Sequence, residues 1–157
     1  MPGVTIYRTV LQPNWIDRDG HLRSACFTLI LSFASDALMD RLQLDSGYRA
    51  STGCTLYSLE MHMHQLHAVN AADSMEVDAH LLETDQKRLH VGFDIRVIGR
   101  PEVVATGEFL YLHVRQGNTP KAVPFPSDIE KAIARFKSEG AGGPWAGPGS
   151  RPISLGN

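Results

Sequence analysis

Residues 27–44 read FTLILSFASDALMDRLQL, and this stretch decides the fold. Polar side chains recur in it every three to four residues and form one narrow stripe, which indicates a helix. Leucine, isoleucine, phenylalanine, alanine and methionine occupy the rest of the helix surface. A helix that is apolar over most of its surface is buried on several sides. Other elements of the chain must therefore wrap around it.

Strands are the candidates for that covering. Alternation of apolar and polar residues with a period of two predicts strands in three segments, 56–66, 75–81 and 89–98. Residues 103–114 are apolar on both faces in places, which predicts a central strand, and residues 4–11 are a plausible fifth.

The turns and the last helix complete the order of elements. Residues 84–86 and 99–101 have the composition of hairpin turns. Residues 127–136 form a short amphipathic pattern, with Ser127 or Asp128 as the expected cap. A strand, a long helix, four strands and a short helix predict an α+β fold, in which one face of an antiparallel sheet covers the helix.

Composition bounds the class of protein. The chain has 157 residues, 43% hydrophobic and 20% charged, as expected for one globular domain. Its net charge of −2, from 15 basic and 17 acidic residues, favours neither nucleic acid nor an anionic membrane as the main partner. No apolar run approaches the roughly 20 residues of a membrane span. Cys26 and Cys54 are expected to be reduced thiols, so we expect a cytoplasmic protein.

The domain boundary is expected near residue 137. Residues 1–137 are predicted to form the single folded domain. Residues 138–157 hold six of the 14 glycines and three of the nine prolines, which predicts a flexible tail. Trp145 is unusual in such a tail, and it could dock on the body or on a neighbouring subunit.

The first candidate site is WIDRDGH, residues 15–21, between the first strand and the long helix. Asp17, Asp19 and His21 cluster there around a turn at Gly20. One interpretation is a plain loop with a helix cap. The other is a carboxylate held beside the start of a buried helix, where free N–H groups can stabilise an oxyanion. The pattern by itself leaves both open.

Two further motifs have weaker functional interpretations. The alternation in 56–66 sets Tyr57 with Leu59, Met61 and Met63 on one face, and Glu60, His62 and His64 on the other. The H-x-H spacing could bind zinc or iron, but further ligands are missing, so a polar face or a substrate pocket is favoured. Lys87 and Arg88 at a hairpin tip form a solvated turn or contact a phosphate.

Asp17, Gly20 and His21 followed by a long helix resemble the hotdog-fold acyl-CoA thioesterases of the 4-hydroxybenzoyl-CoA thioesterase type. The similarity runs from about residue 4 to residue 126 and includes KRLH at 87–90. Within that family, GHLR at 20–23, SDALMDRL at 35–42 and LEMH at 59–62 look most like the thioesterases of bacterial carnitine breakdown, which cleave betainyl-CoA. Two positions depart from the family pattern: Arg23 and Ser24 replace a common Asn, and Ser32 and Phe33 replace a common acid.

The resemblance implies a hotdog fold and hydrolysis of a small acyl-CoA thioester without a cofactor or a metal. It implies Asp17 as nucleophile or general base, and an N–H near Ser24 as oxyanion donor. It implies that His21 orients Asp17 or hydrogen-bonds near the carbonyl. The implied substrate contacts are Trp15, Gly20, Arg23, Phe27, Tyr57, Glu60, His62, Lys87 and Arg88. For a betainyl group, Trp15, Phe27, Phe33 and Tyr57 are candidate aromatic walls, with Glu60 or Asp36 as counter-charge. A homodimer or homotetramer is expected, and the alternative function is a non-catalytic acyl-CoA or small-molecule binding protein.

Overall fold

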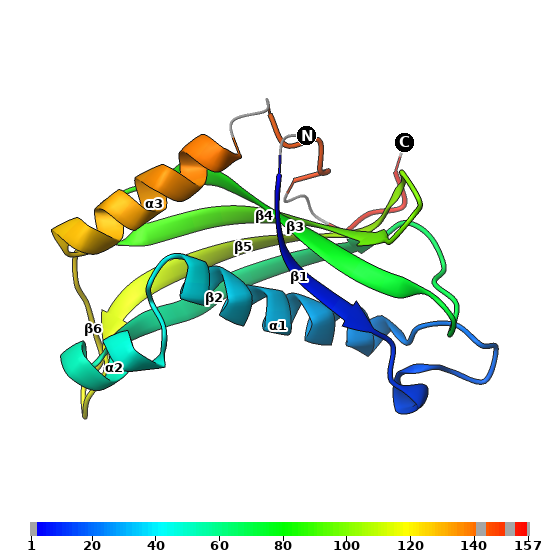
Figure 1. Cartoon of the computed structure of the whole chain (residues 1–157), viewed down its shortest axis with the longest axis horizontal. Coiled ribbons are helices and arrows are strands. Elements are labelled where there is room, and N and C mark those ends of the chain that lie inside the picture. The colour runs from blue at the N-terminus through cyan, green and yellow to red at the C-terminus, as the bar shows by residue number, and fades with distance from the viewer. Residues whose placement is uncertain (1–2, 141–143, 150–152, 157) are drawn as a thin grey trace.

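The long helix expected from the polar stripe is α1, which runs from Ser24 to Arg41. In the computed structural model, which describes residues 3–140, 144–149 and 153–156, it lies along one face of a curled sheet (Figure 1). The helix begins and ends three residues before its expected bounds of 27 and 44. Its last turn is closed by Gln43, which adopts a positive φ of 62°.

The sheet is antiparallel throughout, and its strands follow the order β1-β3-β4-β5-β2. The strands are β1 (Val4–Val10), β2 (Cys54–Gln65), β3 (Ser74–Thr84), β4 (Arg88–Val97) and β5 (Val103–Arg115). The two expected hairpins join β3 to β4 and β4 to β5, and β5 is central as its composition predicted. The short β6 (Lys121–Ala122) pairs with β5.

The core lies between α1 and the inner face of the sheet. Apolar residues of α1 such as Ile30 and Leu31 are fully buried against the inward residues of β4, which include Val91 and Phe93. Burying each such side chain contributes about 1.5–3 kcal/mol. Gly107 of β5 lets Leu31 approach the sheet, because a Cβ there would lie 2.5 Å from Leu31 Cδ1. The antiparallel sheet around one helix confirms the predicted hotdog fold.

Three short elements were not expected from the sequence, and one of them is the strand β6. The helix α2 (Ser46–Thr52) is capped by Asp45, whose side chain accepts the Tyr48 N–H at 2.9 Å, and it ends at Gly53 with φ of 71°. A 3-10 turn, η1, covers Pro13–Trp15.

The C-terminal helix α3 runs from Ser127 to Glu139, so it passes the boundary expected near residue 137. Its N-cap is Pro126 without a side-chain cap bond, so the predicted capping by Ser127 or Asp128 is wrong. Its apolar face, which includes Ile133 and Phe136, joins the core. It contacts β3, whose pairing with β1 stops at Ala79, so α3 lies beside a part of β3 that pairs with β4 but no longer with β1.

One sequence expectation about β2 is wrong. The register shifts between Ser58 and Glu60, which marks a β-bulge. An extra residue reverses which side chains face the core, so the expected alternation holds on only one side of the bulge. Tyr57 is opposite Leu112 and Glu60 is opposite Leu110, and these four side chains therefore share the outer face.

None of the helices within the described residues is long and apolar enough to cross a membrane.

Candidate active site

Asp17 lies in a tight hairpin that leads directly into α1. The Arg23 N–H donates to the Trp15 carbonyl at 2.8 Å, and the Asp17 N–H donates to the His21 carbonyl at 2.8 Å. The turn closes through the Gly20 N–H, which donates to the Asp17 carbonyl at 3.2 Å. Gly20 has φ of 82°, a conformation that glycine adopts without strain.

The hairpin is anchored to a loop that follows β2. The Leu22 N–H donates to the carbonyl of the fully buried Val69 at 2.8 Å, and His21 forms an isolated bridge with Asn70. These bonds join segments nearly 50 residues apart in the sequence. The position of Asp17 is therefore set by main-chain hydrogen bonds rather than by the side chain's own packing.

The carboxylate of Asp17 is held by two backbone donors. Oδ1 accepts the Asp19 N–H at 2.9 Å and the His21 N–H at 3.0 Å. The His21 N–H is the largest influence and lowers the pKa of Asp17 below its ordinary value, partly opposed by desolvation. His21 thus holds Asp17 through its main chain, and its own side chain is exposed. The carboxylate is charged at neutral pH, as a nucleophile or general base requires.

The first residue of α1, Ser24, lies seven residues after Asp17. Its N-cap residue, Arg23, is extended and makes no side-chain cap hydrogen bond, and no acidic residue lies in the first turn. The first N–H groups of a helix have no partner within it and carry the positive end of the helix dipole. An anion or a developing oxyanion near Ser24 would be stabilised there.

The polar stripe of α1 hydrogen-bonds the sheet. The Ser24 hydroxyl donates to Gln65 Oε1 at 3.1 Å, and one turn later the Thr28 hydroxyl contacts Met63 Sδ at 3.5 Å. Further along, Ser35 Oγ lies 2.5 Å from Tyr111 Oη. Ser35 also donates to the Leu31 carbonyl at 2.9 Å, so Tyr111 is the donor of their shared bond. Gln65 was not among the residues expected at the site, because a polar residue at a strand end resembles a solvated one.

The four aromatic residues expected near the substrate lie in four different places. Trp15 is partly buried and lies at the base of the Asp17 hairpin, bonded through its carbonyl to Arg23. Phe27 is 2% exposed and belongs to the core. Phe33 is 39% exposed and lies beside Tyr7, with ring centroids 6.0 Å apart. Tyr57 faces the outer side of the sheet, away from α1.

Glu60 and His62 line a pocket of about 610 Å³ on the outer face of the sheet. His90 and Glu108 line it as well, with His90 Nε2 2.6 Å from Glu108 Oε1. This face is opposite the one that covers α1, so these residues do not meet Asp17 within one protomer. No group of three His, Cys, Asp or Glu among the described residues is arranged to hold a metal ion, and the H-x-H pair gains no third ligand there.

Lys87 and Arg88 lie at the β3–β4 hairpin, as expected. Arg88 Nε donates to Asp85 Oδ2 at 2.7 Å, and Asp85 Oδ1 accepts the N–H groups of Lys87 and Arg88. The Lys87 N–H and the Arg88 side chain lower the pKa of Asp85 to about 2. Asp85 therefore neutralises much of the charge of Arg88, and Lys87 is the more available cation for a phosphate.

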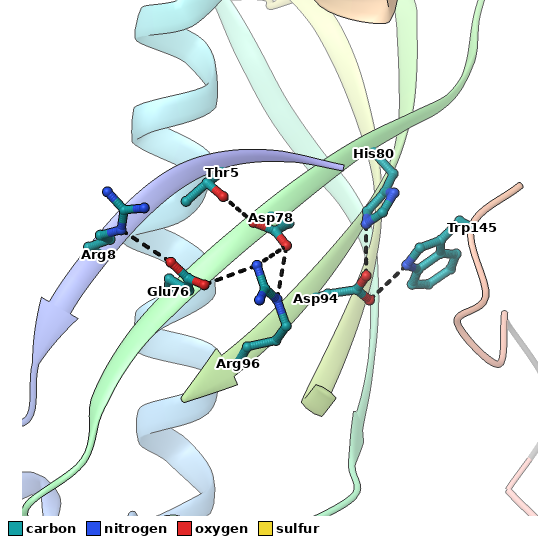
Figure 2. Close-up of polar contacts among 8 residues, drawn as sticks. All are labelled: Thr5, Arg8, Glu76, Asp78, His80, Asp94, Arg96 and Trp145. Atoms are coloured by element: carbon teal, nitrogen blue, oxygen red, sulfur yellow. Dashed lines mark hydrogen bonds and ion pairs between the residues drawn. The ribbon is translucent and has the colours of Figure 1, made fainter. Parts of the chain in front are cut away.

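The outer face of β3 and β4 carries a second polar cluster, drawn in Figure 2. Arg96 donates to Asp78 at 2.5 Å and to Glu76 at 3.0 Å, while Glu76 also accepts from Arg8 at 3.2 Å. Asp78 is buried, and the Thr5 hydroxyl donates to it at 2.5 Å. The paired charges link β1, β3 and β4, which is a structural role.

Trp145 docks on the body, beside this cluster (Figure 2). Its indole Nε1 donates to Asp94 Oδ1 at 2.9 Å, and its ring lies 6.3 Å from that of His80. His80 Nε2 contacts the other carboxylate oxygen, Oδ2, at 2.8 Å. The ring also lies over Gly92, where a Cβ would be 2.6 Å from Trp145 Cδ2. Residues 141–143, 150–152 and 157 of the expected flexible tail lie outside the described residues.

A buried histidine not expected from the sequence ties α2 to the C-terminal segment. His113 Nδ1 lies 2.7 Å from the Val123 carbonyl, and Tyr48 Oη lies 2.8 Å from His113 Nε2. A carbonyl only accepts, so Nδ1 carries the proton and Nε2 accepts from Tyr48. Its ring also contacts that of Phe125 at 4.9 Å.

Comparison with known proteins places this geometry in a family. Residues 11–133 match the model of the Thioesterase-like superfamily. The chain is 38% identical to a betainyl-CoA thioesterase of Pseudomonas aeruginosa over 126 residues, which cover 80% of this chain and 79% of that one. It is 34% identical over 144 residues to an L-carnitine dehydrogenase/betainyl-CoA thioesterase of Agrobacterium fabrum, covering 90% of this chain but 29% of that longer protein.

Solved structures agree with the fold. A Pseudomonas putida protein assigned to the thioesterases superposes with a TM-score of 0.85 at 34% identity, covering 100% of this chain and 99% of that one. A Staphylococcus aureus protein solved in complex with CoA has a TM-score of 0.87 at 20% identity, covering 99% and 98%, and this likeness concerns the fold alone. With its curled sheet, its central helix and this sequence match, the chain belongs to the Thioesterase-like superfamily.

Proposed function

We propose that the protein hydrolyses an acyl-CoA thioester to the free acid and CoA, and that betainyl-CoA is its substrate. One observation carries the proposal: a charged carboxylate, Asp17, is fixed in a hairpin that leads into the uncapped N-terminus of α1. A carboxylate on a hairpin that leads into the first N–H groups of a helix can provide both parts that thioester hydrolysis needs, an attacking or activating group and an oxyanion site.

The chemistry follows from that placement. The thioester carbonyl binds with its oxygen at the N–H groups near Ser24. Asp17 either attacks the carbonyl carbon, forming an anhydride that water then hydrolyses, or removes a proton from a water that attacks directly. In both routes the C–S bond breaks, CoA leaves as thiolate and takes up a proton, and one water is consumed. His21 supports Asp17 through its N–H, and Gly20 allows the turn.

The betainyl group restricts which aromatic residue can contact its ammonium. The ammonium nitrogen is two bonds from the carbonyl carbon, so its contacts must lie near the start of α1. Phe33 is nine residues beyond Ser24, which at about 1.5 Å per residue places it roughly 13 Å away along the axis. Trp15 lies beside Arg23 through its carbonyl bond and is the aromatic wall we propose. The charge of Asp17 supplies the counter-ion.

We propose that the active unit is a homodimer formed through β2. This 12-residue strand is at the sheet edge, and it exposes Leu59 (51%) and Met61 (43%). An exposed apolar edge strand is a template for pairing with another strand. Antiparallel pairing of two β2 strands would join the sheets of two protomers into one, and a tetramer would need a further contact between sheet faces.

The dimer explains how one CoA reaches both Asp17 and Lys87. Within a protomer, the first turn of α1, into which the Asp17 hairpin leads, contacts the Gln65 end of β2. The Lys87 hairpin is level with the Tyr57 end, because Arg88 and Tyr57 both pair with Leu112. Eight residues of strand separate these ends by about 26 Å. Antiparallel pairing brings the Tyr57 end of one copy to the Gln65 end of the other. The phosphates would then contact Lys87 of the second subunit.

The test is release of CoA from a panel of purified acyl-CoA thioesters, with the free thiol measured by a colorimetric reagent. Betainyl-CoA is expected to give the highest kcat/KM, and an uncharged acyl group of similar size is the matched control. Asp17→Asn is expected to reduce turnover by at least 1000-fold while the protein still binds CoA. Tight CoA binding without turnover of any thioester would instead identify a non-catalytic binding protein.

A further inference from the structure

Gln65 is the last residue of β2, and its side chain lies on the face of the sheet that covers α1. It pairs in register with Ala105, which is fully buried in the core, so both side chains are directed to the same face. The Ser24 hydroxyl reaches it across 41 residues of sequence and donates to Oε1 at 3.1 Å. The end of the sheet and the first residue of α1 are thereby joined at the proposed oxyanion site.

The direction of this bond determines what the rest of the carboxamide can do. A glutamine side chain has one carbonyl acceptor and an NH₂ group with two donors. Because Ser24 occupies the acceptor, the donors of Nε2 remain for another partner. Gln65 and Ser24 are both exposed in the protomer, so a ligand can approach them. The N–H groups of the first helical turn lie at the same place.

We infer that the Gln65 amide is a second hydrogen-bond donor to the thioester carbonyl oxygen, oriented for that task by the Ser24 hydroxyl. This inference rests on the proposed function. As the attacking oxygen bonds to the carbonyl carbon, the C=O π electrons move onto the carbonyl oxygen, and the helix N–H and Gln65 Nε2 both donate to it. When the electrons return, the C–S bond breaks and the thiolate leaves. Gln65 exchanges no proton in either step.

The neighbouring contact on the same helix shows what a purely structural role looks like. Thr28 occupies the next turn of α1 and contacts Met63, the preceding inward residue of β2. A thioether is a weak acceptor with no donor, so this contact mainly packs the helix on the strand. If Gln65 only joined α1 to β2, a methionine of similar length would replace it without loss.

The experiment compares Gln65→Met, Ser24→Ala and the double variant with wild type, using betainyl-CoA. Removing an oxyanion donor typically lowers kcat by about 100-fold or more, and this is the expected effect of Gln65→Met with KM nearly unchanged. Ser24→Ala keeps the helix N–H and leaves Gln65 untethered, so a loss of about 10-fold is expected. The double variant should be no slower than Gln65→Met, because Ser24 acts through Gln65.

Two further variants separate catalysis from folding. Gln65→Glu preserves the shape and still accepts from Ser24, but its ionised carboxylate cannot donate, so it should be at least as slow as Gln65→Met. Thr28→Val removes the equivalent hydroxyl one turn later and should retain turnover within about 2-fold. Urea denaturation of each variant is expected to show little change in the free energy of unfolding.

The outcomes distinguish this inference from the function on which it rests. If wild type releases CoA and Asp17→Asn does not, but Gln65→Met and Gln65→Glu turn over like wild type, the donor role of Gln65 is wrong and the thioesterase function stands. Additive losses in the double variant would contradict the link through Ser24. If wild type releases no CoA from any thioester in the panel, both proposals fail together.

Discussion

Replacing Gly92 by alanine should have opposite effects on stability with and without Trp145. The indole ring occupies the space above Gly92, so a Cβ there would lie 2.6 Å from Trp145 Cδ2 and 2.7 Å from Cε2. A shift of the ring would disturb the hydrogen bond from its Nε1 to Asp94 and its contact with His80. Gly92→Ala must therefore displace Trp145 from the sheet.

The magnitude follows from what Trp145 contributes when docked. A half-buried indole removes on the order of 100 Å² of surface from water, which corresponds to about 2.5 kcal/mol. Its hydrogen bond to the Asp94 carboxylate adds about 1.5–3 kcal/mol. Release of residues 144–149 regains chain entropy and offsets part of this sum. We expect Trp145→Ala and Gly92→Ala each to lower the free energy of unfolding by about 2 kcal/mol.

The double variant gives the decisive result. Once the indole is absent, alanine in a strand is favoured over glycine by about 0.5–1 kcal/mol, so Gly92→Ala should then stabilise the protein. Urea denaturation followed by circular dichroism measures all four proteins, because far-ultraviolet signal does not depend on the tryptophan removed. If Gly92→Ala destabilised the Trp145→Ala protein as much as wild type, the docked position of Trp145 would be wrong.

Three other outcomes follow from the structure. Backbone N–H groups lower the pKa of Asp17, and the charged form is the active one in the proposed mechanism. The value of kcat/KM should therefore stay constant from pH 8 to pH 5 and fall only below about pH 4. A decrease that begins near pH 6 would contradict this. His113→Leu should lower the free energy of unfolding, measured in urea, by about 2–3 kcal/mol, because it leaves the Tyr48 hydroxyl and the Val123 carbonyl without their partner. Tyr48→Phe should lower it by about 1 kcal/mol, and equal losses in the two variants would contradict the chain of bonds. Met61→Asp places two carboxylates near the axis of the proposed β2 dimer, so the variant should run as a monomer in size-exclusion chromatography and no longer release CoA. An active monomer would contradict the proposal that the active unit is the β2 dimer.

Periodicity was sufficient to predict the two longer helices, the five long strands and their layers, but not the short elements η1, α2 and β6. The spacing of polar and apolar residues in α1 and in the strands shows which face of each element meets the core, and it can be read from each segment by itself. The bulge between Ser58 and Glu60 was not predictable in the same way. It adds one residue without changing the composition, and it moves Tyr57 to the outer face. Strict alternation therefore grouped Tyr57 with Met61 and Met63, which face the other side of the sheet.

The candidate site likewise contains some residues that a local sequence pattern identifies and others that it does not. Asp17 and Gly20 could be found from the sequence, because a carboxylate and a turn-forming glycine before a buried helix form a local pattern. Gln65 could not, since its position beside Ser24 depends on where β2 ends relative to α1. The pairing of Arg88 with Asp85 was also missed, although the two residues lie three apart, because Lys87 and Arg88 were considered only as cations.

The anchoring of the Asp17 hairpin explains why its carboxylate needs no buried environment to be positioned. Main-chain bonds fix the hairpin at three points: Trp15 with Arg23, Val69 with Leu22, and Asp17 with the residues of its own turn. A side chain positioned by packing would lose water and gain a raised pKa, which would leave the acid neutral near physiological pH. Positioning through backbone donors has the opposite effect, because the same N–H groups that orient the carboxylate also favour its charged form. The fold thus supplies geometry and charge together, and the substrate's own binding would then exclude water from a carboxylate that is already in place.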